Sequence, residues 1–187
     1  MVDPLDIINY DRTDIELEEF LMFSIVVAGK TAATQSKALG RFFDYIPEAI
    51  SPFYVIKTML SENCLYHYVK QSRLGQYTKI TKAFMELIEK NIDPRTCTLE
   101  ELESVHGIGP KTARFFLLYT RPNQRYAVLD THILKFIRDY LDLDVPRSTP
   151  SGKKYMELED KFLEYVDTTG RSIPEVDLEI WTMYSKG

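Results

Sequence analysis

Two side chains with reactive potential, Lys111 and Asp130, lie nineteen residues apart in the second half of the chain. A lysine amine becomes a nucleophile when it loses its proton, and burial or a nearby helix N-terminus lowers its pKa toward that state. An aspartate that opens a helix lies close to free backbone N–H groups, which favour the ionised carboxylate. The pair therefore offers an amine and a carboxylate, with a surface lysine and a plain helix cap as the simpler alternatives.

Lys111 follows a Gly-x-Gly turn, Gly107-Ile108-Gly109, which separates two stretches with helical spacing of apolar residues. Glycine at both positions permits positive φ and the close approach of another backbone. Pro110 fits the first turn of the following helix, where a missing N–H costs nothing. The unpaired N–H groups and the dipole at that helix start suit a phosphate oxygen. The turn is a candidate phosphate site, and a purely structural hairpin is the alternative.

The segment from Leu102 to Tyr140 resembles the helix-hairpin-helix superfamily of base-excision DNA glycosylases, which includes endonuclease III and the 8-oxoguanine DNA glycosylases. The superfamily pattern is Gly-φ-Gly-x-Lys-x-Ala, where φ is apolar, followed by a Gly/Pro-rich loop and then Asp-x-His. This chain has Gly107 to Ala113, then Arg121 to Gln124, then Asp130-Thr131-His132. Because the lysine, the aspartate and the histidine all match together, the resemblance is specific.

The resemblance implies an all-α fold of two helical lobes with the active site in the cleft between them. We expect residues 29–143 to form the lobe with the helix-hairpin-helix, and residues 1–28 with 144–187 to form the second lobe. The sequence also predicts an all-α chain by itself, because no stretch alternates polar and apolar residues between turn signals. Asp14 is expected to cap the first helix, and Thr98 is expected to cap the first helix of the hairpin.

The resemblance implies a reaction at C1′ of a damaged nucleotide. Lys111 would attack this carbon and form an imine that permits strand cleavage by β-elimination. Asp130 would stabilise the positively charged, oxocarbenium-like transition state. The expected activity is that of a bifunctional DNA glycosylase/AP lyase, with 8-oxoguanine as the expected lesion. Two alternatives stay open: a glycosylase for another lesion, such as an oxidised pyrimidine or a mismatched base, and a non-catalytic helix-hairpin-helix module that binds DNA.

Further binding residues are implied by the same resemblance. The expected DNA contacts are Gly107, Gly109, Lys111, Thr112, His132 and Lys30. Lys30 lies where this family inserts a polar side chain into the DNA stack, and a helix-ending loop is the alternative. The end of the chain is similar to that of compact archaeal-type 8-oxoguanine glycosylases, which implies a base pocket with Trp181, Asp177 and Lys186. Trp181 has a second interpretation as a core residue of a terminal helix.

Cofactor expectations follow from the cysteines and from the hairpin. Cys64 and Cys97 are the two cysteines of the chain, too few for a four-thiolate iron–sulfur cluster. Endonuclease III and its adenine-specific relatives usually carry such a cluster, so the resemblance favours the cluster-free branches. Both thiols are expected to be reduced. Backbone carbonyls of Glu103, Val105 and Ile108 match those that hold a monovalent cation, K⁺ or Na⁺, in relatives.

Composition gives weaker guidance. The chain has 187 residues, 44% of them hydrophobic, and a formal net charge of −5. Residues 107–138 are locally basic, with six Lys or Arg and one acid, while acids gather at 14–19, 100–103 and 157–160. Apolar runs stay below the roughly 18 residues of a membrane span, and the N-terminus does not resemble a signal peptide. We expect a monomer that binds damaged double-stranded DNA in the cytoplasm or nucleoid, and no membrane association.

Overall fold

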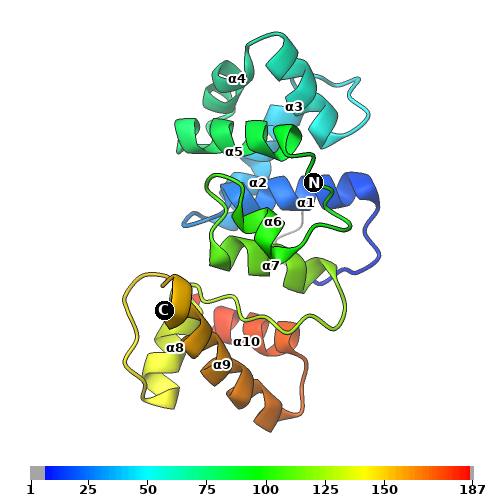
Figure 1. Cartoon of the computed structure of the whole chain (residues 1–187). Coiled ribbons are helices and arrows are strands. Elements are labelled where there is room, and N and C mark those ends of the chain that lie inside the picture. Colours follow the sequence, from blue (N-terminus) through cyan, green and yellow to red (C-terminus); the bar gives the residue numbers. More distant parts are fainter. Residues whose placement is uncertain (1–6, 186–187) are drawn as a thin grey trace. The chain divides into compact units, whose positions relative to one another are not determined.

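The computed structural model describes residues 7–185, and every regular element in this range is a helix (Figure 1). The prediction of an all-α chain is confirmed. Within the described range, no helix has the length and apolar character needed to cross a membrane. The helices are α1 (Asp14–Val26), α2 (Ala32–Phe43), α3 (Pro52–Ser61), α4 (Leu65–Gln71), α5 (Tyr77–Glu89), α6 (Leu99–Glu103), α7 (Pro110–Thr120), α8 (Thr131–Leu141), α9 (Gly152–Thr169) and α10 (Ile173–Ser185).

The chain divides into two compact units, residues 1–108 and residues 109–187. The first unit contains α1 to α6, and the second contains α7 to α10. The boundary falls within the Gly-x-Gly turn, between Ile108 and Gly109. The lobes expected from the family resemblance, residues 29–143 and residues 1–28 with 144–187, stay a prediction.

The first unit is built around α5, which packs against α1, α3 and α4. The buried face of α5 is apolar and has helical spacing, which explains why this stretch folds as an amphipathic helix. One ring contact illustrates the packing: the Phe84 and Phe42 ring centroids lie 5.6 Å apart. The buried residues of α5 are Ile80, Ala83, Phe84 and Leu87.

The first helix begins one residue earlier than predicted, because its N-cap is Thr13 and not Asp14. The Thr13 hydroxyl accepts a hydrogen bond from the Glu16 N–H at 3.3 Å, and Glu16 Oε2 accepts one from the Thr13 N–H at 2.8 Å. This reciprocal capping box satisfies two backbone donors, whereas Asp14 lacks a glutamate at the matching distance. The same arrangement caps α6, where Thr98 and Glu101 confirm the predicted cap.

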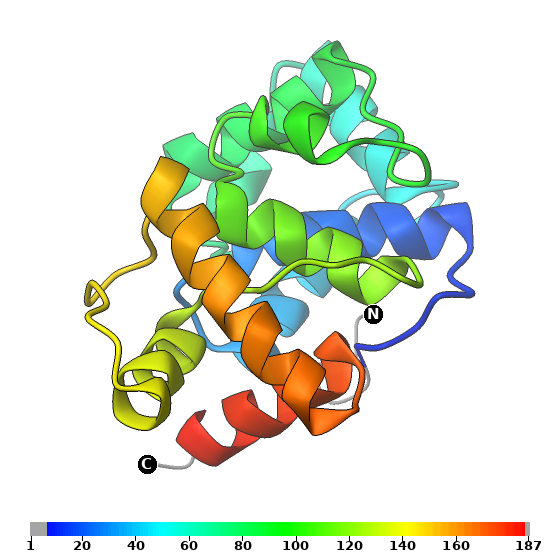
Figure 2. The same cartoon turned by 60° about the horizontal axis from the view of Figure 1, so that its bottom comes forward.

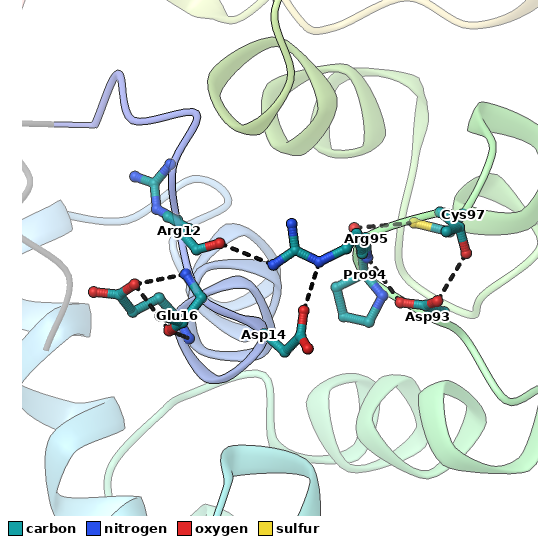
Figure 3. Close-up of polar contacts among 9 residues, drawn as sticks. Arg12, Asp14, Glu16, Asp93, Pro94, Arg95 and Cys97 are labelled. Atoms are coloured by element: carbon teal, nitrogen blue, oxygen red, sulfur yellow. Dashed lines mark hydrogen bonds and ion pairs between the residues drawn. The ribbon is translucent and has the colours of Figure 1, made fainter.

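Asp14 instead binds Arg95, which connects the start of α1 to the loop before α6 (Figure 3). Arg95 Nε donates to Asp14 Oδ1 at 2.6 Å, and its Nη2 donates to the Arg12 carbonyl at 3.0 Å. Asp93 orders the loop from the other side, because its Oδ1 accepts the Arg95 N–H and its carbonyl accepts the Cys97 N–H. The arginine therefore joins two segments of the first unit that are distant in sequence.

The second unit has its core between α8, α9 and α10. The last helix packs against both α8 and α9, and Figure 2 shows the red α10 beside the orange α9. Apolar side chains from these helices and from the segment before α8 form one buried cluster. Its members include Ala127, Leu129, Ile133, Leu134, Phe136, Ile137, Tyr155, Leu158, Phe162, Val166, Val176 and Ile180.

Candidate active site

The two glycines of the Gly-x-Gly turn have different backbone conformations. Gly107 has φ of +82°, and a Cβ built there would lie 2.8 Å from Lys79 Cε. Glycine is required at this position because side chains disfavour the left-handed region. Gly109 has φ of −96° and open space around an added Cβ. Gly109 therefore does not use the positive φ that glycine permits, and it takes the extended conformation of an N-cap.

The helix that follows, α7, begins without a side-chain cap. Its N-cap is Gly109, and its first residue, Pro110, has no N–H. Lys111 and Thr112 come next, so both lie in the first turn, where backbone N–H groups lack helical partners. The free amides and the helix dipole make this end attractive to an anion.

Lys111 is half-buried near this helix start, and its pKa is lowered from the ordinary lysine value. Burial of the ammonium is the main cause, while the carboxylates of Asp130 and Asp177 act in the opposite direction. The Nζ atom lies 5.2 Å from the centroid of the Phe115 ring. The direction agrees with the expectation for a nucleophilic amine, because less energy is needed to remove its proton.

Asp130 is the N-cap of α8, which confirms that it opens a helix. Its Oδ1 accepts hydrogen bonds from the backbone N–H groups of His132 and Ile133, both at 2.9 Å. These two bonds fix the carboxylate at the helix start, where the dipole favours negative charge. Lys111 and Asp130 belong to the same unit and interact electrostatically.

The backbone before Asp130 is held by side chains of α9 that the sequence analysis did not identify as functional. Glu159 Oε1 accepts the Ala127 N–H at 2.8 Å. The Tyr155 hydroxyl donates to the Ala127 carbonyl at 2.7 Å and accepts the Leu129 N–H at 3.2 Å. Because a short extended segment has no helical hydrogen bonds of its own, these contacts set the position from which Asp130 starts α8.

Glu159 also forms a buried ion pair with Arg114, a residue of α7. The Arg114 Nε donates to Glu159 Oε1 at 2.8 Å, and the two side chains are 8% and 10% exposed. Glu159 thus contacts both the helix of Lys111 and the segment that leads to Asp130. The sequence contained one signal for the role of Glu159. This residue lies between Leu158 and Phe162 on the apolar stripe of α9. A charged side chain at such a buried position needs a partner of opposite charge.

Ion pairs of this kind also change the interpretation of the positive charge counted in residues 107–138. Arg114 is buried with Glu159, and Arg125 forms a two-point ion pair with Asp167, with distances of 3.0 and 2.7 Å. Two of the six positive charges counted between residues 107 and 138 therefore have acidic partners from α9. The charge available to an external anion is smaller than the sequence count indicates.

Asp177 is a second carboxylate near Lys111, and it is only 5% exposed. The Tyr119 hydroxyl donates a hydrogen bond to Asp177 Oδ2 at 2.5 Å. Burial raises the pKa of Asp177 to about 7, with a further contribution from Asp130, while the Tyr119 hydrogen bond and Lys111 lower it. Tyr119 was not predicted as a site residue, because its 58-residue separation from Asp177 gives no sequence signal.

Trp181 lies on α10 at the surface of the second unit, with 38% of the residue exposed. Its ring meets the His132 ring edge to face, with centroids 5.7 Å apart. The interpretation of Trp181 as a core residue is therefore wrong, because the residue is exposed and not buried. The predicted pocket residue Lys186 lies outside the described residues.

Lys30 and the predicted cation ligands lie in the first unit. The Lys30 ammonium donates to the Leu74 carbonyl at 2.6 Å, and burial and then nearby Lys79 lower its pKa. The Val105 carbonyl accepts the Ile108 N–H at 3.0 Å, which closes the turn after α6. A carbonyl oxygen has a second lone pair, and carbonyl oxygens are the preferred ligands of K⁺. The monovalent-cation site expected on the carbonyls of Glu103, Val105 and Ile108 stays a prediction.

Comparisons with known proteins identify the family of this chain. A family model described as 8-oxoguanine DNA glycosylase matches residues 7–171. An 8-oxoguanine DNA glycosylase/AP lyase of Metallosphaera sedula is 30% identical over 122 residues, which cover 64% of this chain and 55% of that protein. A protein of the same name from Fusobacterium nucleatum is 28% identical over 102 residues, covering 54% and 46%. The chain spans about half the length of these relatives, and it belongs to the 8-oxoguanine DNA glycosylase family.

Proposed function

We propose that this protein is a bifunctional DNA glycosylase/AP lyase that removes an oxidised base from duplex DNA, with 8-oxoguanine as the expected lesion. The family and the names of the two relatives support this activity. The observation that carries the proposal is the position of Lys111, which is half-buried in the uncapped first turn of α7 and interacts electrostatically with Asp130. A plain surface lysine has no reason to be desolvated at a helix end that suits a phosphate.

Asp130 supplies the electrostatic part of the reaction. Cleavage of the bond between base and sugar develops positive charge at C1′ and the ring oxygen, and a fixed carboxylate stabilises that charge. Its two backbone hydrogen bonds keep the Asp130 carboxylate from reorienting as the charge appears. Preorganisation of this kind removes a cost that a mobile side chain would bear during the reaction.

Lys111 supplies the covalent part. The free amine attacks C1′, the base departs, and the opened sugar forms an imine with Nζ that permits β-elimination of the 3′ phosphate. Burial favours the neutral amine, so the reactive fraction of Lys111 is larger than that of an ordinary lysine at the same pH. Sodium borohydride reduces such an imine to a stable amine, which makes the intermediate measurable.

The remaining predicted residues bind the DNA. The first amides of α7 and the His132 side chain would contact phosphate. The carbonyls of Glu103, Val105 and Ile108 would hold a monovalent cation. The target base must leave the stack to reach Lys111. The exposed indole of Trp181 offers a surface for stacking on that base, with Asp177 and Lys186 as further pocket residues.

Borohydride trapping on defined duplexes tests the proposal. We expect wild-type protein to form a covalent adduct with an 8-oxoguanine duplex and not with an undamaged one. Lys111→Gln should abolish the adduct and keep DNA binding, because the phosphate-binding groups of α7 are backbone amides. The matched control is Lys161→Gln, which removes a surface lysine paired with Glu164 and should trap normally.

The alternatives give different results in the same assay. An adduct on an oxidised-pyrimidine duplex but not on 8-oxoguanine would change the lesion and keep the chemistry. Base release without any adduct would make the enzyme monofunctional. DNA binding without base release or adduct would leave a non-catalytic binding module.

A further inference from the structure

Asp177 has an unusual hydrogen-bonding state for a buried carboxylate. Its Oδ2 accepts the Tyr119 hydroxyl, whereas its Oδ1 is buried and has no hydrogen-bond partner in the part of the chain that the structure describes. Buried polar atoms are almost always satisfied, because an unmade hydrogen bond costs about 1–3 kcal/mol. An oxygen that bears this cost at the proposed active site points to a chemical role.

Four ionisable groups face Asp177 from the helices of the second unit. Lys111 and Tyr119 belong to α7, Asp130 starts α8, and Tyr155 lies on α9. Among these four groups, Lys111 is the one that carries a positive charge. Within residues 7–185, no carboxylate lies close enough to the Lys111 ammonium to form an ion pair. The buried carboxylate and the half-buried lysine therefore interact electrostatically, and each has a polar atom without a hydrogen-bond partner within residues 7–185.

We propose that Asp177 is the acid–base partner of Lys111: its carboxylate removes a proton from the ammonium through one bridging water, and the resulting carboxyl group later returns that proton to the departing oxygen. The inference rests on the proposed function, because it assigns a role within the imine-forming reaction of Lys111. It is distinct from the base-reading role expected for Asp177, since it concerns the sugar and not the base.

The proton balance can be followed on the aldehyde form of an abasic site. Asp177 accepts one proton from the Lys111 ammonium, which leaves a neutral amine and a neutral carboxyl group. The amine adds to C1′ and gives a carbinolamine, whose hydroxyl carries the former aldehyde oxygen. The carboxyl group protonates this hydroxyl, water departs, and the protonated imine forms while Asp177 becomes a carboxylate again.

The proton affinities of the two groups suit this exchange. The pKa of Lys111 is lowered mainly by burial, and burial raises the pKa of Asp177 to about 7. The two shifts bring the proton affinities of the acid and the base closer together, which lowers the cost of moving a proton between them. General acid–base catalysis is most effective when the pKa of the catalytic group lies near the working pH.

The test is single-turnover borohydride trapping from pH 5.5 to pH 9 on a duplex with one natural abasic site. This substrate has no base, so a variant that only loses base recognition traps it at the wild-type rate. We expect the trapping rate of the wild type to have a bell-shaped pH profile. The reason is that the Lys111–Asp177 pair reacts when it holds one proton between its two groups, and not when it holds two protons or none. Asp177→Asn should trap about a hundredfold more slowly and lose the alkaline limb.

Three comparisons exclude a purely structural or electrostatic effect. Removing the negative charge of Asp177 lowers the pKa of Lys111, so an electrostatic role alone predicts faster trapping by Asp177→Asn at neutral pH. Tyr119→Phe removes a hydrogen bond that lowers the pKa of Asp177, and its acidic limb should move to higher pH. Asp160→Asn replaces an exposed acid of α9 and should reproduce the wild-type profile.

Thermal unfolding serves as the fold control. Because the pKa of Asp177 is raised to about 7, the native state keeps a proton that the unfolded state releases above the ordinary aspartate pKa. Wild-type stability should therefore fall as pH rises toward 7, and Asp177→Asn should gain most at pH 8. If Asp177→Asn does not fold, the pH profile of Tyr119→Phe carries the test.

The outcomes separate this inference from the proposed function. Wild-type trapping on the abasic duplex, with slow trapping and a lost alkaline limb in Asp177→Asn, supports both. Wild-type trapping with an unchanged or faster rate in Asp177→Asn, or with an unmoved limb in Tyr119→Phe, overturns the role of Asp177 and leaves the lysine chemistry intact. Absence of trapping by the wild-type protein itself overturns the proposed function.

Discussion

The starts of α7 and α8 are built in opposite ways, although both carry a residue proposed for the reaction. At the start of α8, the Asp130 carboxylate binds two backbone N–H groups of the first turn. At the start of α7, Gly109 provides no side-chain acceptor, and Lys111 follows in the open first turn. The capped end fixes an acid of the protein itself, while the uncapped end leaves its amides open to the phosphate that we propose binds there.

The difference shows how one physical property of helices serves two purposes. Both ends combine free donors with the positive end of a dipole. Whether the N-cap residue has an oxygen acceptor decides whether the protein or a ligand satisfies those donors. Variants that remove, exchange or add a cap can therefore test each end separately.

The largest effect on stability is expected from a substitution of Glu159, because this side chain contacts both α7 and the segment before α8. Glu159→Ala removes the acid of a buried ion pair with Arg114 and the acceptor of the Ala127 N–H. Loss of one partner of a buried ion pair costs about 3–5 kcal/mol. Urea unfolding should show this loss, whereas Glu157→Ala, at an exposed position of the same helix, should stay within about 0.5 kcal/mol of wild type. Similar losses in both variants would mean that the pair does not connect the two starts.

The second prediction separates the two roles of Asp130. Asp130→Asn keeps a side-chain acceptor and loses the charge, while Asp130→Ala loses both. Each should slow base release about a hundredfold or more, because neither offsets the positive charge of the transition state. Only Asp130→Ala should also lose about 1 kcal/mol of stability from the missing cap. Single-turnover base release and thermal unfolding measure these effects, and wild-type activity in Asp130→Asn would contradict the electrostatic role.

Local features of this chain could be predicted well from sequence. Thr98 and Asp130 were identified as helix caps because a cap is determined by residues within one helical turn. The error at α1 has the same local origin, since Thr13 and Asp14 are both good caps. The decisive signal was Glu16 three residues after Thr13, the spacing of a capping box.

The supporting contacts of the site could not be predicted in the same way. Arg114 and Glu159 are 45 residues apart, and Tyr119 and Asp177 are 58 residues apart. Such pairs depend on how helices pack, and a single sequence carries periodicity but no partner information. The family pattern supplied Lys111 and Asp130 because it records the spacing of one continuous segment. It contained nothing about Tyr119 or Glu159, which act through contacts between distant helices.

The third prediction concerns the turn before α7. Gly107→Ala places a side chain at φ of +82° and a Cβ close to Lys79. The left-handed conformation costs about 1–2 kcal/mol for a residue with a Cβ, although the flexible Lys79 side chain can move. Thermal unfolding should show this loss, and the distorted turn should bind duplex DNA about tenfold more weakly. A stable variant with wild-type affinity would show that the turn tolerates another conformation.

The smallest effect on stability, and the most direct test of the comparison, is expected from Gly109→Ser. Gly109 has the extended backbone of an N-cap, with φ of −96° and ψ of 178°, and a Cβ there has no atom within 4 Å. A serine hydroxyl should therefore cap α7 and stabilise the protein by a few tenths of a kcal/mol. The same hydroxyl would occupy the amides proposed for phosphate, so duplex affinity should fall about fivefold, or about 1 kcal/mol. Fluorescence anisotropy at two salt concentrations measures this loss, and a weaker salt dependence than wild type would show that a phosphate contact is missing. If Gly109→Ser gains stability and keeps its affinity, the amides of α7 do not bind phosphate, and the open helix end has another purpose than holding DNA.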